Sequence, residues 1–192
     1  MTIEKTKTTD VVSSGLTCNL KANETAQATG LFEIKCHDKD GNLKWEAQSK
    51  NLVVNVGLAY MAGTALTSVA QITTWYIGLY GAGASNTPAA ADTMSSHAGW
   101  TEVVAYSNVT RVAATFVTAT TANPSVATNS ASPAVFNING TTTVGGAFLT
   151  SGSAKSGTVG TLFSAADFGS PGDRSVVNSD TLSVTYTFSL AG

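Results

Sequence analysis

Charged side chains are scarce over most of this 192-residue sequence. Of its 22 Asp, Glu, Lys and Arg residues, 14 lie within the first 50 positions and only eight in the rest. Chemistry at neutral pH normally needs a cluster of titratable groups or a metal site. The composition therefore argues against an enzyme, and we expect neither catalytic residues nor a cofactor. Thr, Ser, Ala, Gly and Val fill the charge-poor region instead, which favours a structural or binding module.

Histidine and cysteine are also nearly absent. The only histidines are His37 and His97, and the only cysteines are Cys18 and Cys36, too few and too scattered for a zinc site. Two free thiols in a reducing cytosol are the expected state, and a disulfide between the two cysteines is the alternative.

Long apolar runs and an excess of positive charge are missing as well. No stretch approaches the ~20 apolar residues that span a bilayer, and the first residues lack the apolar run of a signal peptide. The net charge is −2 and the sequence pI is about 5.6, so there is no basic field of the kind that binds DNA or RNA. We therefore expect a protein made and kept in a cytoplasm, with no membrane or nucleic-acid partner.

Residues 1–29 differ from the rest and predict an extended N-terminal arm, followed by one domain over residues 30–192. The arm is rich in Thr, Lys, Glu, Asn and Ala and shows no sustained helical or strand period. A segment of this kind gains order by lying along another protein, so we expect it on a partner or a neighbouring subunit. Its predicted contacts are its scattered apolar residues Ile3, Val11, Val12, Leu16 and Leu20.

The first regular pattern predicts a β-hairpin. Apolar and polar residues alternate over residues 32–37 and again over residues 43–47. The connecting residues 38–42 contain Asp-Gly, which is a strong turn signal. One face is apolar and the other charged, as expected for a half-buried antiparallel pair.

A buried strand and one short helix are expected next. Residues 51–55 are apolar enough for the strand, and residues 56–62 form the best helix candidate, with Asn55 as its N-cap. Gly57 and Gly63 weaken that helix, because glycine is a poor helix former.

The remaining pattern consists of strands separated by loops rich in Gly, Ser, Ala and Pro. Strands are expected at residues 73–80, 100–106, 109–118, 134–138 and 143–149. The last two would form a hairpin about Asn139-Gly140, a hairpin turn signal. Loops are expected at residues 81–93, 120–133 and 151–157.

The clearest strand is the last one. Over residues 181–190, apolar side chains alternate without error with hydroxyl side chains, so one face is apolar and the other carries Thr and Ser rather than charges. Several short strands with frequent turns favour an all-β fold. We expect an antiparallel β-sandwich or jelly-roll-like domain with one short helix.

Two short motifs resemble ligand-binding loops but depart from them at required positions. Residues 38–42 begin like a calcium loop, yet Leu43 stands where glycine is required and Ser49 where a bidentate acid is required, so a turn is favoured. Residues 152–156 resemble part of a phosphate loop, but the first glycine of that motif falls on Leu149. Neither motif predicts a metal or a nucleotide.

His97 and the aromatic residues allow more than one interpretation. His97 is expected to be a loop histidine bonded to backbone, and the alternatives are a pH-sensitive interface contact and a catalytic residue. Five aromatic residues fall in strand patterns: Trp45, Trp75, Tyr76, Tyr80 and Trp100. Core or subunit interface is favoured for them over a sugar-stacking surface.

Six segments, in order along the chain, carry a resemblance to a known family: residues 32–45, 51–58, 75–79, 97–102, 145–149 and 180–188. The first of them contains the Asp-Lys-Asp-Gly-Asn turn and ends in Trp45. With these segments the chain resembles the small virion proteins of tailed bacteriophages over about residues 30–190. The arm lies outside the resemblance.

The resemblance implies a virion protein without catalytic residues, of the head decoration, cement or tail-associated type. A cement protein gains affinity from many repeated weak contacts, and a charge-poor Thr/Ser face packs against another protein without burying unpaired ions. We therefore expect a homo-oligomer, with a trimer favoured by the usual three-fold lattice sites, that binds the major capsid protein and stabilises the head. It would lie on the capsid surface of the virion after synthesis in the host cytoplasm.

Two other functions are kept as alternatives. A tail- or fibre-associated virion protein that contacts a host-surface glycan would need an exposed aromatic cluster around Trp75 or Trp100. A hydrolase would need His97 as its catalytic residue.

Overall fold

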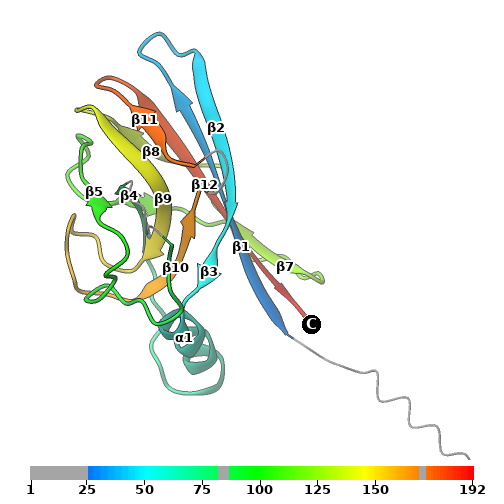
Figure 1. Cartoon of the computed structure of the whole chain (residues 1–192). Helices are drawn as coiled ribbons and strands as arrows, with labels where there is room; N and C mark the ends of the chain where they lie inside the picture. The colour runs from blue at the N-terminus through cyan, green and yellow to red at the C-terminus, as the bar shows by residue number, and fades with distance from the viewer. Residues whose placement is uncertain (1–25, 82–86, 169–171) are drawn as a thin grey trace, which may run out of the picture.

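The computed structural model describes residues 26–81, 87–168 and 172–192, and the statements below concern this part of the chain. Two antiparallel β-sheets pack face to face as a sandwich, accompanied by one short helix (Figure 1). The all-β sandwich predicted from the sequence is therefore confirmed. Residues 1–25 of the predicted arm, which include Cys18, lie outside the described residues.

The first sheet, sheet A, is built around the two longest strands. β1 (Gln27–His37) and β12 (Thr181–Ala191) pair in antiparallel fashion over all 11 residues. Both strands alternate apolar and polar residues, so a single register buries both apolar faces at once. Three further strands complete the sheet: β2 (Leu43–Lys50) beside β1, and β7 (Ser125–Thr128) and β8 (Ala134–Asn137) along the other edge of β12.

The second sheet, sheet B, has seven strands around a centre of three. β9 (Thr142–Thr150) lies between β4 (Trp75–Gly81) and β10 (Leu162–Asp167), and both pairings are antiparallel. Four short strands flank this centre: β3 (Leu52–Val53) on β10, β5 (Glu102–Val103) and β6 (Val112–Ala114) on β4, and β11 (Arg174–Val176) on β9.

The space between the sheets is filled by the inward faces of both. Sheet A contributes Phe32, Ile34 and Val184, each at most 1% exposed, and sheet B contributes the fully buried Ile77 and Leu79. Burying a large apolar side chain is worth about 1.5–3 kcal/mol. The period-two pattern that predicted β1 and β12 is therefore also what holds the two sheets together.

Sheet B carries a second apolar cluster on its outer face. Tyr80, Phe148 and Leu162 project from its central strands, and Met94 and Trp100 cover them from the loop before β5. Because the central strands are buried on both faces, they form nearly continuous apolar runs instead of alternating ones. This is why β10 shows no alternation and was not predicted.

The helix α1 (Asn55–Leu66) is longer than expected and begins differently. The predicted N-cap is wrong, because Asn55 is the first helical residue, Val54 is the N-cap and no side chain caps the helix. Val54 is fully buried in the outer cluster of sheet B, so packing rather than capping sets the start of the helix. Gly57 is needed where α1 meets β10, because a Cβ there would overlap the carbonyl oxygen of Phe163.

The hairpin predicted about Asn139-Gly140 does not form. β8, before this turn, pairs with β12 in sheet A, whereas β9, after it, pairs with strands of sheet B. The turn therefore carries the chain from one sheet to the other. Ile138 is held at the crossing by a bridge to Tyr106 and by its amide, which donates to the carbonyl oxygen of Asp180. A local turn signal reveals neither contact.

Several predicted boundaries need correction. Residues 100–106 and 109–118 contain only the short strands β5 and β6, which lie end to end along β4, so each pairs with part of that strand. Residues 120–133, predicted as loop, contain β7, and β11 was not predicted. The hairpin of β1 and β2 and the strands β3, β4 and β12 are confirmed, although β1 already begins at Gln27.

Candidate functional site

An open groove between the two sheets is the candidate binding site. It has a volume of about 490 Å³, which lies within the range of ligand pockets. Its walls come from α1, the segment before β4, and strands of both sheets. We call it the inter-sheet groove and define it by five aromatic residues that line it: Tyr60, Trp75, Phe116, Phe163 and Phe188.

Four of these rings form a continuous chain of edge contacts along the floor of the groove. The ring centroids of Tyr60 and Trp75 are 5.4 Å apart, those of Trp75 and Phe163 are 5.4 Å apart, and those of Phe163 and Phe188 are 5.5 Å apart. Edge-to-face packing at such distances is favourable. The Tyr60 hydroxyl also accepts a hydrogen bond from the Ile72 amide at 2.7 Å. The floor is therefore preformed.

The rim of the groove is polar but carries no charge. Gln71, Thr73, Thr74 and Thr115 are exposed there, and none of the described residues that line the groove is Asp, Glu, Lys, Arg or His. A charged group entering the groove would lose its water without gaining an ionic partner. The groove therefore suits an apolar, uncharged occupant.

The inward-facing row of β12 leaves the core as it enters the groove. Tyr186 is fully buried and Phe188 is half-buried, while Leu190, the next residue on the same face, is 40% exposed. The apolar face of sheet A thus continues past the groove without a covering layer of sheet B.

The chain enters the sandwich beside this groove. Phe188 pairs across the sheet with Gly30, which is only three residues after Gln27, or about 10 Å along the strand. Figure 1 shows that the start of β1, the C terminus and β7 lie together at one end of sheet A. β1 therefore begins in the neighbourhood of the groove.

A buried ion pair fixes the loop between β9 and β10. Arg111 and Glu102 are 1% and 5% exposed, and the Arg111 Nε and Nη2 atoms donate to the two carboxylate oxygens at 2.9 and 2.7 Å. Arg111 also donates to the carbonyl oxygens of Gly152 at 2.8 Å and Gly157 at 3.0 Å, and Glu102 accepts from the Ser156 amide at 2.7 Å. Both charges are satisfied internally, so the pair holds the loop in place.

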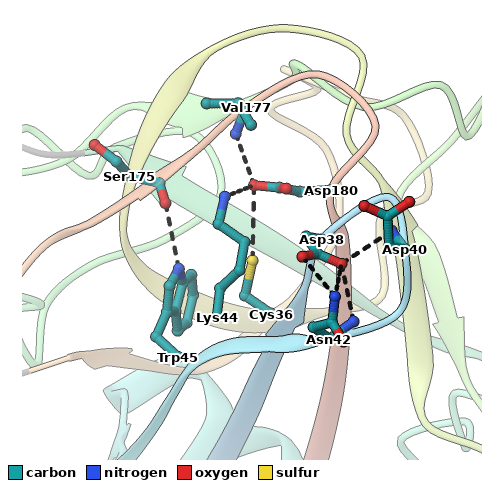
Figure 2. Close-up of polar contacts among 9 residues, drawn as sticks. All are labelled: Cys36, Asp38, Asp40, Asn42, Lys44, Trp45, Ser175, Val177 and Asp180. Carbon is teal, nitrogen blue, oxygen red and sulfur yellow. Dashed lines mark hydrogen bonds and ion pairs between the residues drawn. The ribbon is translucent and has the colours of Figure 1, made fainter.

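A second buried carboxylate, Asp180, joins three elements (Figure 2). It accepts hydrogen bonds from Lys44 Nζ at 2.5 Å, from the Val177 amide at 2.8 Å and from the Cys36 thiol at 3.8 Å. Burial, followed by the charge of Asp180, raises the pKa of Cys36 to about 11. The hydrogen bond to Asp180 raises the pKa of Lys44. Cys36 is therefore a buried, protonated thiol, which is the opposite of a reactive cysteine.

The turn over residues 38–42 uses its acidic side chain for the backbone. Asp38 Oδ1 accepts from the amides of Asp40 and Asn42, both at 2.9 Å (Figure 2). These hydrogen bonds, with that from Asn42 the strongest cause, lower the pKa of Asp38. The turn interpretation is confirmed. In the part of the chain that the structure describes, no group of three or more His, Cys, Asp and Glu residues could hold a metal ion.

His97 lies beside a second cavity of about 520 Å³ on the outer side of sheet B. Its ring stacks on Trp100 with centroids 3.8 Å apart, and its Nδ1 is 2.9 Å from the Trp100 carbonyl oxygen. The nearby carboxylate of Asp92 accepts from the Trp100 indole at 3.0 Å instead. The expected loop histidine bonded to backbone is confirmed, and no described carboxylate is hydrogen-bonded to the ring.

The aromatic residues divide between core and groove. Trp100 and Tyr80 are buried in the outer cluster of sheet B, so an exposed cluster around Trp100 is contradicted. The Trp45 indole donates to the Ser175 carbonyl oxygen at 3.2 Å (Figure 2). Trp75 is half-buried and lies in the floor of the inter-sheet groove.

The interface residues predicted in the arm, namely Ile3, Val11, Val12, Leu16 and Leu20, lie outside the described residues. Sequence reasoning missed the groove, because Tyr60 and Phe163 are more than 100 positions apart and no local pattern connects them. It also missed the ion pair of Glu102 and Arg111. A signal for that pair existed, since both are charged residues in the charge-poor region.

Among the described residues, no helix is long and apolar enough to cross a membrane. No family model matches the sequence, and comparison with curated proteins and with solved structures also gives no match.

Proposed function

We propose that this chain is a decoration or cement protein of a tailed-bacteriophage head. In this proposal it forms a homo-oligomer, with a trimer favoured, and binds the lattice of the major capsid protein from outside. It is made in the host cytoplasm and ends on the capsid surface of the virion. There it stabilises the head through repeated contacts that are individually weak but collectively strong.

The observation that carries the proposal is the inter-sheet groove. It is preformed, apolar and uncharged, and it opens beside the start of β1. Since none of the described residues lining it is Asp, Glu, Lys, Arg or His, it suits a segment of another protein better than a reacting substrate. A groove and an N-terminal segment give each copy two separate sites for binding other protein chains, whether neighbouring copies or the lattice.

The use of charge supports a fastening role. Six of the eight charged residues after position 50 make internal hydrogen bonds or ion pairs: Asp92, Glu102, Arg111, Lys155, Arg174 and Asp180. Lys155, for example, donates to the Tyr106 carbonyl oxygen at 2.6 Å and lies 3.9 Å from the centre of the Tyr106 ring. These charges hold loops on strands, so they favour a domain built to resist unfolding.

Heads assembled without this chain provide the test. Purified chain is added to such heads, and its copies per head are counted by quantitative mass spectrometry. We expect saturation at a fixed ratio to the major capsid protein, and a higher temperature of DNA release from the saturated heads. A variant lacking residues 2–25 is expected to occupy fewer sites. Absence of saturable binding by the full chain would overturn the proposal.

A glycan-binding tail or fibre role is the second candidate, and the position of Trp75 favours it. The half-buried indole lies in the floor of the groove with the side chains of Gln71, Thr73 and Thr74 at the rim. Sugars bind by stacking on such rings and by hydrogen bonds to amides and hydroxyls. Binding to a glycan array by the full chain but not by Trp75→Ala would favour this role over head decoration.

A further inference from the structure

We propose that the inter-sheet groove of each copy is filled by residues 11–20 of a second copy of this chain. This inference deepens the proposed function and rests on its homo-oligomer. The groove presents apolar surface that no described residue covers: Trp75, Phe116 and Phe188 are only half-buried, and Leu190 beyond them is 40% exposed. Covering such surface is favourable.

Residues 11–20 have the chemistry that the groove accepts. They form the longest uncharged stretch within the first 50 residues, bounded by Asp10 on one side and Lys21 on the other. Four of the ten are large apolar residues: Val11, Val12, Leu16 and Leu20. An apolar segment with uncharged polar residues between matches an aromatic floor with a rim of Thr and Gln. The charges at its two ends would remain in water.

The length of chain allows the segment to reach a neighbouring copy. Leu20 lies seven residues before Gln27, which corresponds to about 23 Å of extended chain. β1 begins close to the groove, because the groove residue Phe188 pairs with Gly30, and the start of β1 lies beside the C terminus and β7 (Figure 1). A span of this length is enough for the apolar residues of one copy to reach the groove of the next.

A second copy is favoured over the chain's own groove by the sequence that precedes β1. To return to its own groove, the chain would have to reverse direction between Leu20 and Gln27. Residues 16–29 contain neither glycine nor proline, and Asn23 is the only turn-favouring residue between Leu20 and Gln27. Exchange of an identical segment between copies needs no such reversal.

Exchange also explains how every groove can be filled at once. The groove and the point where the segment leaves lie at the same end of each copy, so one copy can give a segment to its neighbour while it receives another. If the rotation that relates each copy to the next returns to the first copy, such head-to-tail exchange yields a closed ring. In that ring no groove is empty and no segment is free. A ring of three would be the trimer favoured above.

A disulfide between the segment and the groove tests the inference directly. Cys18 already lies within residues 11–20, and Cys36 is fully buried and does not compete. Thr115→Cys places a thiol at the exposed rim of the groove. Thr158→Cys, at another exposed threonine, which lines the cavity beside His97, is the matched control. Full chains labelled with heavy and light nitrogen are mixed, oxidised mildly and mapped by mass spectrometry.

We expect disulfides between Cys18 and the introduced cysteine at position 115 that join heavy to light chains, and covalent multimers on a non-reducing gel. The Thr158→Cys variant, and Thr115→Cys combined with Cys18→Ser, should remain single chains. Adding Leu16→Glu should lower the yield of the link roughly tenfold or more, because it brings a charge into the groove. The control for Leu16→Glu is Thr17→Glu, which adds the same charge one position along the chain.

Two results would overturn the inference. The first is a link that forms only within single chains, and the second is a yield for Thr115→Cys no higher than for Thr158→Cys. The outcome is separable from the proposed function. If the chain binds heads but the disulfide does not form, only the exchange of residues 11–20 is refuted. If the disulfide forms but the chain does not bind heads, only the decoration role is refuted.

Discussion

The ring of Tyr80 lies directly over Gly146, its register partner across β4 and β9. The neighbouring pair is reversed, with Phe148 of β9 lying over Gly78 of β4. A Cβ at either glycine would overlap the opposite ring. The outer cluster of sheet B therefore exists because two glycines leave room for two rings, which Trp100 then covers.

Replacing Gly146 with alanine should destabilise the protein by about 3 kcal/mol. The new methyl group would meet both the Tyr80 ring and the carbonyl oxygen of Ala166, and the backbone atom cannot move aside as a side chain can. Gly140→Ala is the matched control, because its Cβ would have only Ala105 within reach, at 3.7 Å. Urea unfolding of both variants measures the difference. Equal midpoints for the two would contradict this account of the cluster.

The buried ion pair should be costly to break from one side only. Glu102→Gln leaves the Arg111 guanidinium buried without its counter-charge, so we expect a loss of about 3–5 kcal/mol. The double variant Glu102→Leu with Arg111→Met removes both charges and should be less unstable than Glu102→Gln, as thermal unfolding would record. Asp40→Asn, in the exposed pair with Lys39, should change nothing measurable. A double variant no more stable than Glu102→Gln would contradict this account of the pair.

Asp180 should contribute more to the free energy of unfolding than its position in a turn indicates. Asp180→Ala removes the acceptor of three hydrogen bonds and leaves the Val177 amide and the Cys36 thiol without it. We expect a loss of about 2–4 kcal/mol in the free energy of unfolding. Asp173→Ala, at an exposed acidic residue, serves as the control. Similar unfolding curves for the two variants would refute the role assigned to Asp180.

Stability should fall at alkaline pH. The pKa of Cys36 is raised by burial from 9.0 to about 11, so its stabilising effect is complete below pH 9 and is lost as the pH rises to 11. Burial also raises the pKa values of Tyr80, Tyr106 and Tyr186, which act in the same direction. Each such group makes the free energy of unfolding fall by up to about 1.4 kcal/mol per pH unit.

The variant Cys36→Ala isolates the thiol. Its unfolding free energy should decrease less steeply between pH 9 and 11 than that of the native protein. The two slopes should differ by up to about 1.4 kcal/mol per pH unit, which corresponds to one proton per molecule. The absolute stability of the variant does not matter for this comparison, because only the slope is read. Identical slopes would mean that Cys36 ionises equally easily in the folded and unfolded chain.

Strands with one buried face could be predicted from the sequence, whereas strands with two could not. β12 alternates along its length and β1 over residues 32–37, and this pattern predicted both the sandwich and the faces of these strands that are buried. β10 is buried on both faces, so alternation is absent. The Asn139-Gly140 turn was recognised, but its partners were not, because a turn signal is local and strand pairing depends on residues far away.

The candidate site required the tertiary structure. The groove joins Tyr60 of α1, Phe163 of β10 and Phe188 of β12, and each of these alone resembles an ordinary core residue. Trp75 was noticed as an aromatic residue in a strand, with core or interface as the favoured interpretation. Its half-buried position in the groove depends on where sheet B stops covering sheet A. That boundary is formed by residues far apart in the chain, so no short stretch of sequence reveals it.

The location of this chain in a particle tests the central claim most directly. A density map of purified virions that carry the gene for this chain, obtained by electron cryomicroscopy, would reveal whether copies are present and where. We expect the sandwich at repeated positions on the outer surface of the head, in contact with the major capsid protein. A head surface without it, or density for it only on the tail, would contradict the account.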